Sequence, residues 1–138
     1  MTRKELLKKI VSELGHADHA IDDARQILMH VLNISHADFL AHDDLEVTRG
    51  QRSKATKLAK ARSQHTPMAY LLGSREFFGR SFPVNKHTLI SRPETELMVE
   101  EAVALSSKDT QFIDVGTGSG AIAITLNLET AQPVIGVD

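Results

Sequence analysis

Apolar residues recur at intervals of three and four over the first half of the chain, and this spacing predicts amphipathic helices. Four helices are each opened by a capping residue or by an acidic first turn. A short fifth helix follows Pro67 and stops at Gly73. These elements together predict a compact helical bundle over residues 1–73. The expected helices span residues 2–14, 19–32, 37–42, 48–64 and 68–72.

The pattern changes at Glu76, where two short apolar runs flank Gly79. Paired apolar runs around a glycine turn are typical of a β-hairpin. We therefore expect a hairpin over residues 74–91 that links the bundle to a third segment, residues 92–138. This segment opens with a helix that carries Pro93 in its first turn and ends near Leu105.

A glycine-rich turn at residues 116–120 organises the third segment. It follows a short apolar strand, residues 111–115, and leads into an apolar helix that begins at Ala121. Glycine accepts φ > 0 and lets the backbone approach a ligand closely, and the amides at a helix start favour electronegative groups. A second strand, residues 134–137, ends in Asp138, where an acidic residue commonly holds ribose hydroxyls. The pattern predicts a nucleotide-binding turn in a Rossmann-like α/β unit.

Two cofactors fit the turn. Residues 116–121 satisfy the permissive dinucleotide pattern with Ala at its last position. Asp114, on the strand just before the glycines, would repel a pyrophosphate but would suit a cationic ligand such as S-adenosylmethionine. Asp114 therefore favours the methyl donor over NAD. A turn without a ligand is the least favoured interpretation, because three glycines carry an entropic cost that packing alone seldom requires.

Composition excludes several classes of function. The chain has 138 residues, 41% hydrophobic and 25% charged, which is typical of a soluble protein, and no apolar run is long enough for a membrane span. The absence of cysteine excludes disulfides and agrees with a cytoplasmic location. A net charge of −2 argues against broad affinity for nucleic acid. The histidines are scattered, with His16 and His19 the closest pair, so no metal site is expected.

The basic residues of the helix over residues 48–64 allow two interpretations. They could form a partner surface, but a solvated helix face is favoured by the sequence alone. The residues concerned are Arg52, Lys54, Lys57, Lys60 and Arg62.

With these elements in place, the chain resembles over its whole length the N-terminal part of a HemK/PrmC-type release factor glutamine methyltransferase. The Arg-Pro-Glu-Thr-Glu stretch is the most specific part of the resemblance. Ser91 departs from the family pattern, which usually has Pro there, and this should loosen the approach to Arg92. The stretches that carry the resemblance are residues 67–73, 76–79, 89–97 and 114–120.

The resemblance implies a class I methyltransferase domain that begins at about residue 92. It implies methyl transfer from S-adenosylmethionine to the side-chain amide nitrogen of the glutamine in the Gly-Gly-Gln motif of peptide chain release factors. The bundle would help to engage the release factor. We expect a cytoplasmic monomer that binds neither membranes nor specific nucleic-acid sequences.

The resemblance also implies a set of cofactor-binding residues. Gly116, Gly118 and Gly120, with Thr117 in the same turn, would line the methionine and ribose part of the donor. Asp114 would face the donor's amino group, and Asp138 would hold the ribose hydroxyls. No catalytic residue is expected within these 138 residues, because the family's Asn-Pro-Pro-Tyr motif belongs after the fourth strand and is absent here.

The missing motif leads us to expect an incomplete methyltransferase domain that is inactive by itself. An alternative from another class is a binding module that engages release factors, or another partner, without chemistry, and the short length of the chain is its main support. A fragment of an NAD-dependent oxidoreductase is the third alternative. Asp114 disfavours it, as do the bundle and the hairpin that precede the first strand.

Overall fold

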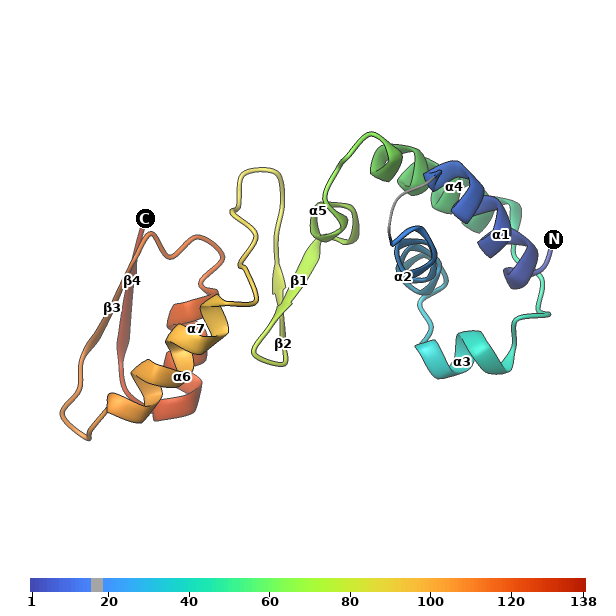
Figure 1. The fold of residues 1–138 in the computed structure, drawn as a ribbon. Helices are drawn as coiled ribbons and strands as arrows, with labels where there is room; N and C mark the ends of the chain where they lie inside the picture. The colour runs from blue at the N-terminus through green and yellow to red at the C-terminus, as the bar shows by residue number, and fades with distance from the viewer. Residues whose placement is uncertain (16–18) are drawn as a thin grey trace. The chain divides into compact units, whose positions relative to one another are not determined.

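The structure is a computed structural model that describes residues 1–15 and 19–138, so His16 of the His16 and His19 pair lies outside the described residues. The chain divides into two compact units, Met1–Leu72 and Gly73–Asp138. Each unit has its own set of elements (Figure 1). Each also has its own cluster of buried apolar residues. The hairpin that the sequence suggests as a linker groups with the second unit.

The regular elements that the structure describes in the first unit are all helices. The two capping boxes that the sequence predicts both form. The Thr2 hydroxyl accepts from the Glu5 amide, and the Glu5 carboxylate accepts from the Thr2 amide. Thr48 and Gln51 repeat this arrangement. These contacts satisfy amides that have no partner within the helix. The third helix begins one residue earlier than expected, directly after its cap Ser35. The helices are α1 (Arg3–Leu14), α2 (Ala20–Leu32), α3 (His36–Ala41), α4 (Arg49–Ser63) and α5 (Met68–Leu72).

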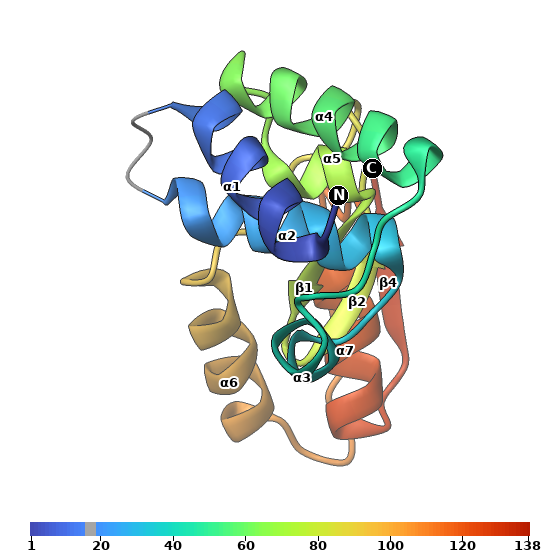
Figure 2. The ribbon, with the colours of Figure 1, turned by 90° about the vertical axis from the view of Figure 1, so that its right-hand side faces the viewer.

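The core of this unit lies between α1, α2 and α4, which Figure 2 shows grouped together. The helix α4 contributes small residues, Ala55 and Ala59, and both are fully buried. Small side chains let the helices approach closely, so α4 packs although six of its 15 residues are Lys or Arg. The larger buried side chains come from α1, α2 and α3: Leu6, Ile10, Ile27, Leu28 and Phe39.

An ion pair joins α2 to α4 at the edge of this core. Asp23 is only 6% exposed, and its Oδ2 accepts from Nε of Arg62 over 2.6 Å. A buried carboxylate without a partner is strongly unfavourable, and Arg62 offsets this cost by pairing with Asp23. The pair fixes how α4 lies against α2.

The second unit combines a hairpin with a β-α-β segment. Strands β1 (Ser74–Phe77) and β2 (Arg80–Pro83) pair antiparallel, whereas β3 (Phe112–Val115) and β4 (Val134–Val137) pair parallel. The helix α7 (Ala121–Thr130) connects β3 to β4 and packs on both, and α6 (Thr95–Leu105) packs beside α7 (Figure 1). Parallel strands need a crossover of this kind.

The hairpin is tied to both helices of its unit. Its two-residue turn has φ of +52° at Phe78 and +69° at Gly79, and a positive φ is unusual for a bulky side chain. The Phe78 amide donates to Oε1 of Glu96 on α6 over 2.9 Å, and Arg80 pairs with Glu129 of α7 over 2.6 Å. The sequence predicted the glycine turn but not the conformation of Phe78, which these contacts hold.

One face of the β3–β4 pair is open among the described residues. Ile113 is 66% exposed and Val115 is 80% exposed, whereas Asp114 between them is buried. Successive side chains of a strand point to opposite faces, so α7 covers only the face of Asp114. Parallel sheets are normally buried on both faces. The mixed architecture of a helical unit followed by α/β elements agrees with the expected fold, and the wider Rossmann-like sheet stays a prediction.

The Asp23–Arg62 pair provides a test of what holds the helical unit together. We expect Arg62→Gln to lower the free energy of unfolding by about 2–3 kcal/mol, because Asp23 is left buried without its charged donor. Urea unfolding followed by helical circular dichroism measures the change. Lys4→Gln is the matched control, since it removes an exposed ion pair to Asp43 and should cost less than about 1 kcal/mol. Equal losses in the two variants would contradict the role given to the buried pair.

Candidate functional site at the glycine turn

The turn from β3 into α7 has the backbone conformation that its glycines allow. The φ values are +81° at Gly116, +54° at Gly118 and +76° at Gly120, a region that other residues rarely adopt. A Cβ atom at Gly116 would meet nothing within 4 Å, and one at Gly118 only a backbone oxygen at 4.0 Å. The bare backbone there faces open space, as a ligand cradle requires. At Gly120 a Cβ would lie 3.1 Å from Ile124, so this glycine serves close packing.

Asp114 fixes the shape of the turn. Its Oδ2 accepts from the Thr117 hydroxyl over 2.8 Å and from the Ala123 amide over 3.2 Å. The first of these bonds stays within the turn, and the second reaches one of the first amides of α7, which have no partner inside the helix. The carboxylate is 9% exposed and therefore acts inside the unit as a brace between the turn and the helix.

The end of β4 lies beside the same turn. The amides of Gly116 and Thr117 donate to the Val137 carbonyl over 2.7 and 3.1 Å, and the Gly118 amide donates to Oδ1 of Asp138 over 3.3 Å. Asp138 is exposed at this position. The structure thus brings the turn and the acidic residue after the second strand into direct contact, and the ribose-binding role of that carboxylate stays a prediction.

A hollow of about 270 Å³ opens next to the turn. Three of the six predicted cofactor residues line it, namely Gly116, Thr117 and Gly118, whereas Asp114, Gly120 and Asp138 do not. Residues 89–92 and Thr95 also line it, and the sequence does not predict them as site residues. The signal was available, because the Arg-Pro-Glu-Thr-Glu stretch was the most specific part of the resemblance.

The lining of the hollow suits a cofactor with both polar and apolar parts. Backbone groups of the turn and the polar residue Ser119 can offer hydrogen bonds, Ile90 and Ile122 supply apolar surface, and Arg92 supplies a cation. Across residues 1–15 and 19–138 no three His, Asp or Glu side chains gather as metal ligands would. None of the described helices is long and apolar enough to cross a membrane. The arrangement can hold a cofactor.

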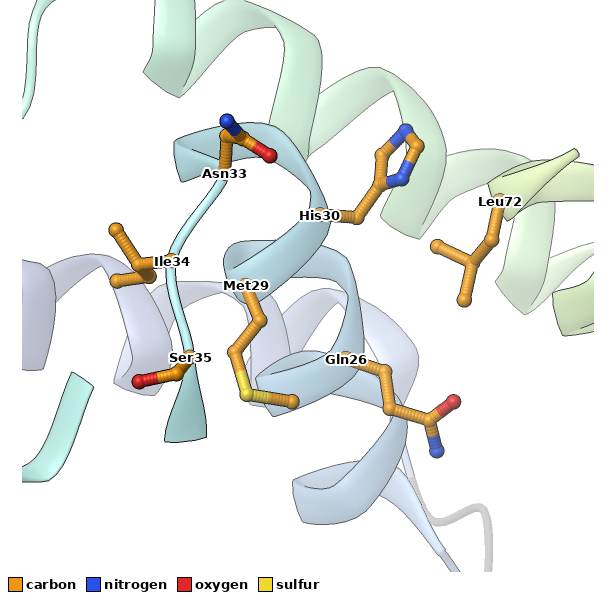
Figure 3. A pocket seen from close by; sticks show the side chains of 7 residues that line it. All are labelled: Gln26, Met29, His30, Asn33, Ile34, Ser35 and Leu72. Atoms are coloured by element: carbon orange, nitrogen blue, oxygen red, sulfur yellow. The ribbon is translucent and has the colours of Figure 1, made fainter. Parts of the chain in front are cut away.

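A larger hollow, of about 490 Å³, lies in the helical unit between α2, the start of α3 and Leu72 of α5 (Figure 3). Burial lowers the pKa of His30, and the nearby charge of Lys54 lowers it further. Of the residues that line this hollow, His30 has the one ionisable side chain, and the others are Gln26, Met29, Asn33, Ile34, Ser35 and Leu72. A single neutral imidazole without an acid, base or nucleophile beside it is not a catalytic arrangement. The glycine turn is therefore the better candidate despite its smaller hollow.

A strand, a glycine turn, a helix and a second parallel strand make up the β-α-β segment of an α/β protein, and a nucleotide-type cofactor is the ligand that such a turn would hold. In this chain a separate helical unit precedes that segment. The sequence model of the PrmC N-terminal domain matches residues 5–73, which cover the helical unit. The chain belongs to the PrmC family.

Relatives that match the chain along most of its length carry the name release factor glutamine methyltransferase. The protein from Neisseria gonorrhoeae is 42% identical over 107 residues, 78% of this chain and 39% of the relative. The protein from Nitratidesulfovibrio vulgaris is 43% identical over 121 residues, 87% of this chain and 41% of the relative. The protein from Haemophilus influenzae is 34% identical over 157 aligned positions, all of this chain and 54% of the relative. The chain spans about half the length of the curated relatives it matches.

Gly136 of β4 tests how closely the turn packs on the sheet. A Cβ atom at Gly136 would lie 3.0 Å from the Thr117 hydroxyl and 3.2 Å from its Cβ. We expect Gly136→Ala to displace Thr117 and to destabilise the second unit by about 1–3 kcal/mol. Amide hydrogen exchange at Ile113 and Ile135 would measure the loss of protection.

Gly50 of α4 is the matched control for this change. Its Cβ would have only the Thr48 hydroxyl nearby, at 4.0 Å, and its φ is not positive. Gly50→Ala should therefore stabilise the helical unit by about 0.4–1 kcal/mol. If hydrogen exchange at Ile113 and Ile135 stays unchanged in Gly136→Ala, the present position of Thr117 is not needed for the stability of the second unit.

Proposed function

We propose that the chain forms the N-terminal part of an S-adenosylmethionine-dependent methyltransferase. Its substrate is the side-chain amide nitrogen of the glutamine in the Gly-Gly-Gln motif of peptide chain release factors. The observation that carries the proposal is the open backbone cradle at Gly116 and Gly118 in a chain whose relatives are named release factor glutamine methyltransferase. The cofactor, when bound, supplies the methyl group on a sulfonium centre.

The residues of the turn fit such a donor. The φ values of Gly116 and Gly118 leave their backbone open beside the hollow, and Ser119 is a further polar residue of its lining. Asp138 would hold the ribose hydroxyls, since its carboxylate lies within reach of the Gly118 amide. Asp114 contributes by bracing the turn, and its negative charge favours a cationic donor over the pyrophosphate of NAD.

The helical unit takes the part of release-factor recognition in this proposal. Its apolar cluster is buried within the unit itself, which suits a module that holds its shape while it binds a partner. The same observation supports the competing proposal of a binding module without chemistry. We place the protein in the cytoplasm as a monomer, and we assign the methyl transfer to a complete domain that includes the Asn-Pro-Pro-Tyr motif.

The choice of cofactor can be measured directly in a protein extended through the rest of the methyltransferase domain. We expect calorimetry to show tighter binding of S-adenosylmethionine than of NAD. Gly118→Val should abolish binding, because a β-branched side chain resists φ > 0 and would fill the cradle. Gly15→Val makes the same change at another glycine with positive φ and open surroundings, in the helical unit, and should leave affinity within about twofold. Tighter binding of NAD would overturn the cofactor assignment.

The division of labour between the two units predicts how the 138 residues behave alone. They should associate with a release factor, because the helical unit is complete, but should transfer no measurable methyl group. Correct placement of reacting groups is worth about 7–11 kcal/mol of barrier, and the motif that orients the amide is absent from these residues. Labelled S-adenosylmethionine and a pull-down, run beside the extended protein, measure both properties. Methyl incorporation by the 138 residues would contradict the role given to the missing motif.

A further inference from the structure

A basic groove of about 440 Å³ runs between α1 and α4 of the helical unit. Five cationic side chains line it: Lys9 from α1, and Arg49, Arg52, Lys57 and Lys60 from α4. None of the five forms an ion pair with a carboxylate of residues 1–15 or 19–138, whereas Arg3, Lys4, Arg25 and Arg62 of the same unit do. The chain carries a formal charge of −2, so this positive surface is a local concentration of charge.

The groove has a regular geometry. The lining positions of α4 are 49, 52, 53, 56, 57 and 60, which follow the pattern i, i+3, i+4, i+7, i+8, i+11 of one helix face. That face extends over roughly 16 Å, at about 1.5 Å per residue. Ser53 and Thr56 add hydroxyl donors between the cations. Ala55 and Ala59 occupy the buried face, so the helical core does not use the basic side chains of the groove.

Unpaired cations held side by side repel one another, and an anionic partner would relieve this repulsion. We infer that the groove is the docking surface for an acidic patch on the release factor that the protein methylates. The inference rests on the proposed function and deepens it, because it assigns release-factor recognition to one face of the helical unit. Guanidinium, ammonium and hydroxyl donors bind carboxylates and phosphates alike, so the surroundings of the groove must distinguish an acidic protein from a nucleic acid.

The surroundings of the groove favour an acidic protein over RNA. Glu5 and Glu13 lie four residues before and after Lys9, on the same side of α1, and would repel a polyanion that continues along the helix. No aromatic side chain lines the groove, so it lacks the stacking surface that single-stranded nucleic acid generally uses. A discrete acidic patch needs neither a continuous basic track nor a stacking platform.

The test measures binding of the 138-residue chain to a release factor at several salt concentrations. The variant Arg52→Gln with Lys57→Gln removes two groove cations and keeps good helix formers. Its control, Lys8→Gln with Lys54→Gln, removes the same number of charges, one from α1 and one from α4, at positions that do not line the groove. Circular dichroism establishes that both variants are folded.

We expect the groove variant to weaken binding by roughly tenfold at low salt and to flatten the salt dependence, while the control changes affinity less than about twofold. Equal effects of the two variants, or no effect of the groove variant, would overturn this inference and leave the proposed methylation intact. A single-stranded RNA that binds the groove more tightly than the release factor would overturn the choice of partner. Methylation by the extended protein, measured separately, decides the proposed function on its own.

Discussion

The carboxylate of Asp114 braces the part of the second unit on which the candidate site depends. It lies at the point where β3 ends, and its Oδ2 receives both the Thr117 hydroxyl and the Ala123 amide. These bonds define a path for a turn that glycine would otherwise leave free, since glycine loses more conformational freedom on folding than any other residue. With the turn held in this way, the amides of Gly116 and Gly118 meet the end of β4. Because Asp114 braces the turn, its negative charge lies near the open backbone of Gly116 and Gly118.

Each unit also relies on a contact that compensates an unfavourable feature. In the helical unit, Arg62 compensates the burial of Asp23. In the second unit, Glu96 accepts from the amide of Phe78, whose positive φ is unfavourable for a bulky side chain. Such features persist only where the surroundings over-determine them. Glu96 belongs to the Arg-Pro-Glu-Thr-Glu stretch, so the same segment stabilises the hairpin turn and, through Arg92 and Thr95, lines the hollow.

The two units differ in how completely they cover their apolar surfaces. The helical unit buries Leu6, Ile10, Ile27 and Leu28 fully, whereas Ile113 and Val115 of β3 are more than half exposed. Burial of apolar surface is the main favourable term in folding, so the helical unit is the better candidate for independent stability. The exposed face of β3 is found in a chain that spans about half the length of its curated relatives. It also agrees with a proposed function in which recognition and chemistry belong to different parts of the protein.

The sequence alone determined the features whose signals lie within a few residues. The capping boxes at Thr2 and Thr48, the glycine turn and the two strands around it were all predicted, because caps and turns depend on spacings of three or four residues. Half of the predicted cofactor residues line the hollow, and only the structure shows that residues 89–92 and Thr95 line it as well. The tertiary structure alone showed that Arg62 pairs with Asp23, that Asp114 turns toward Thr117 and Ala123, and that Lys9 joins the cations of α4. These contacts depend on which faces of distant elements pack together, and burial of apolar surface across the whole unit decides that.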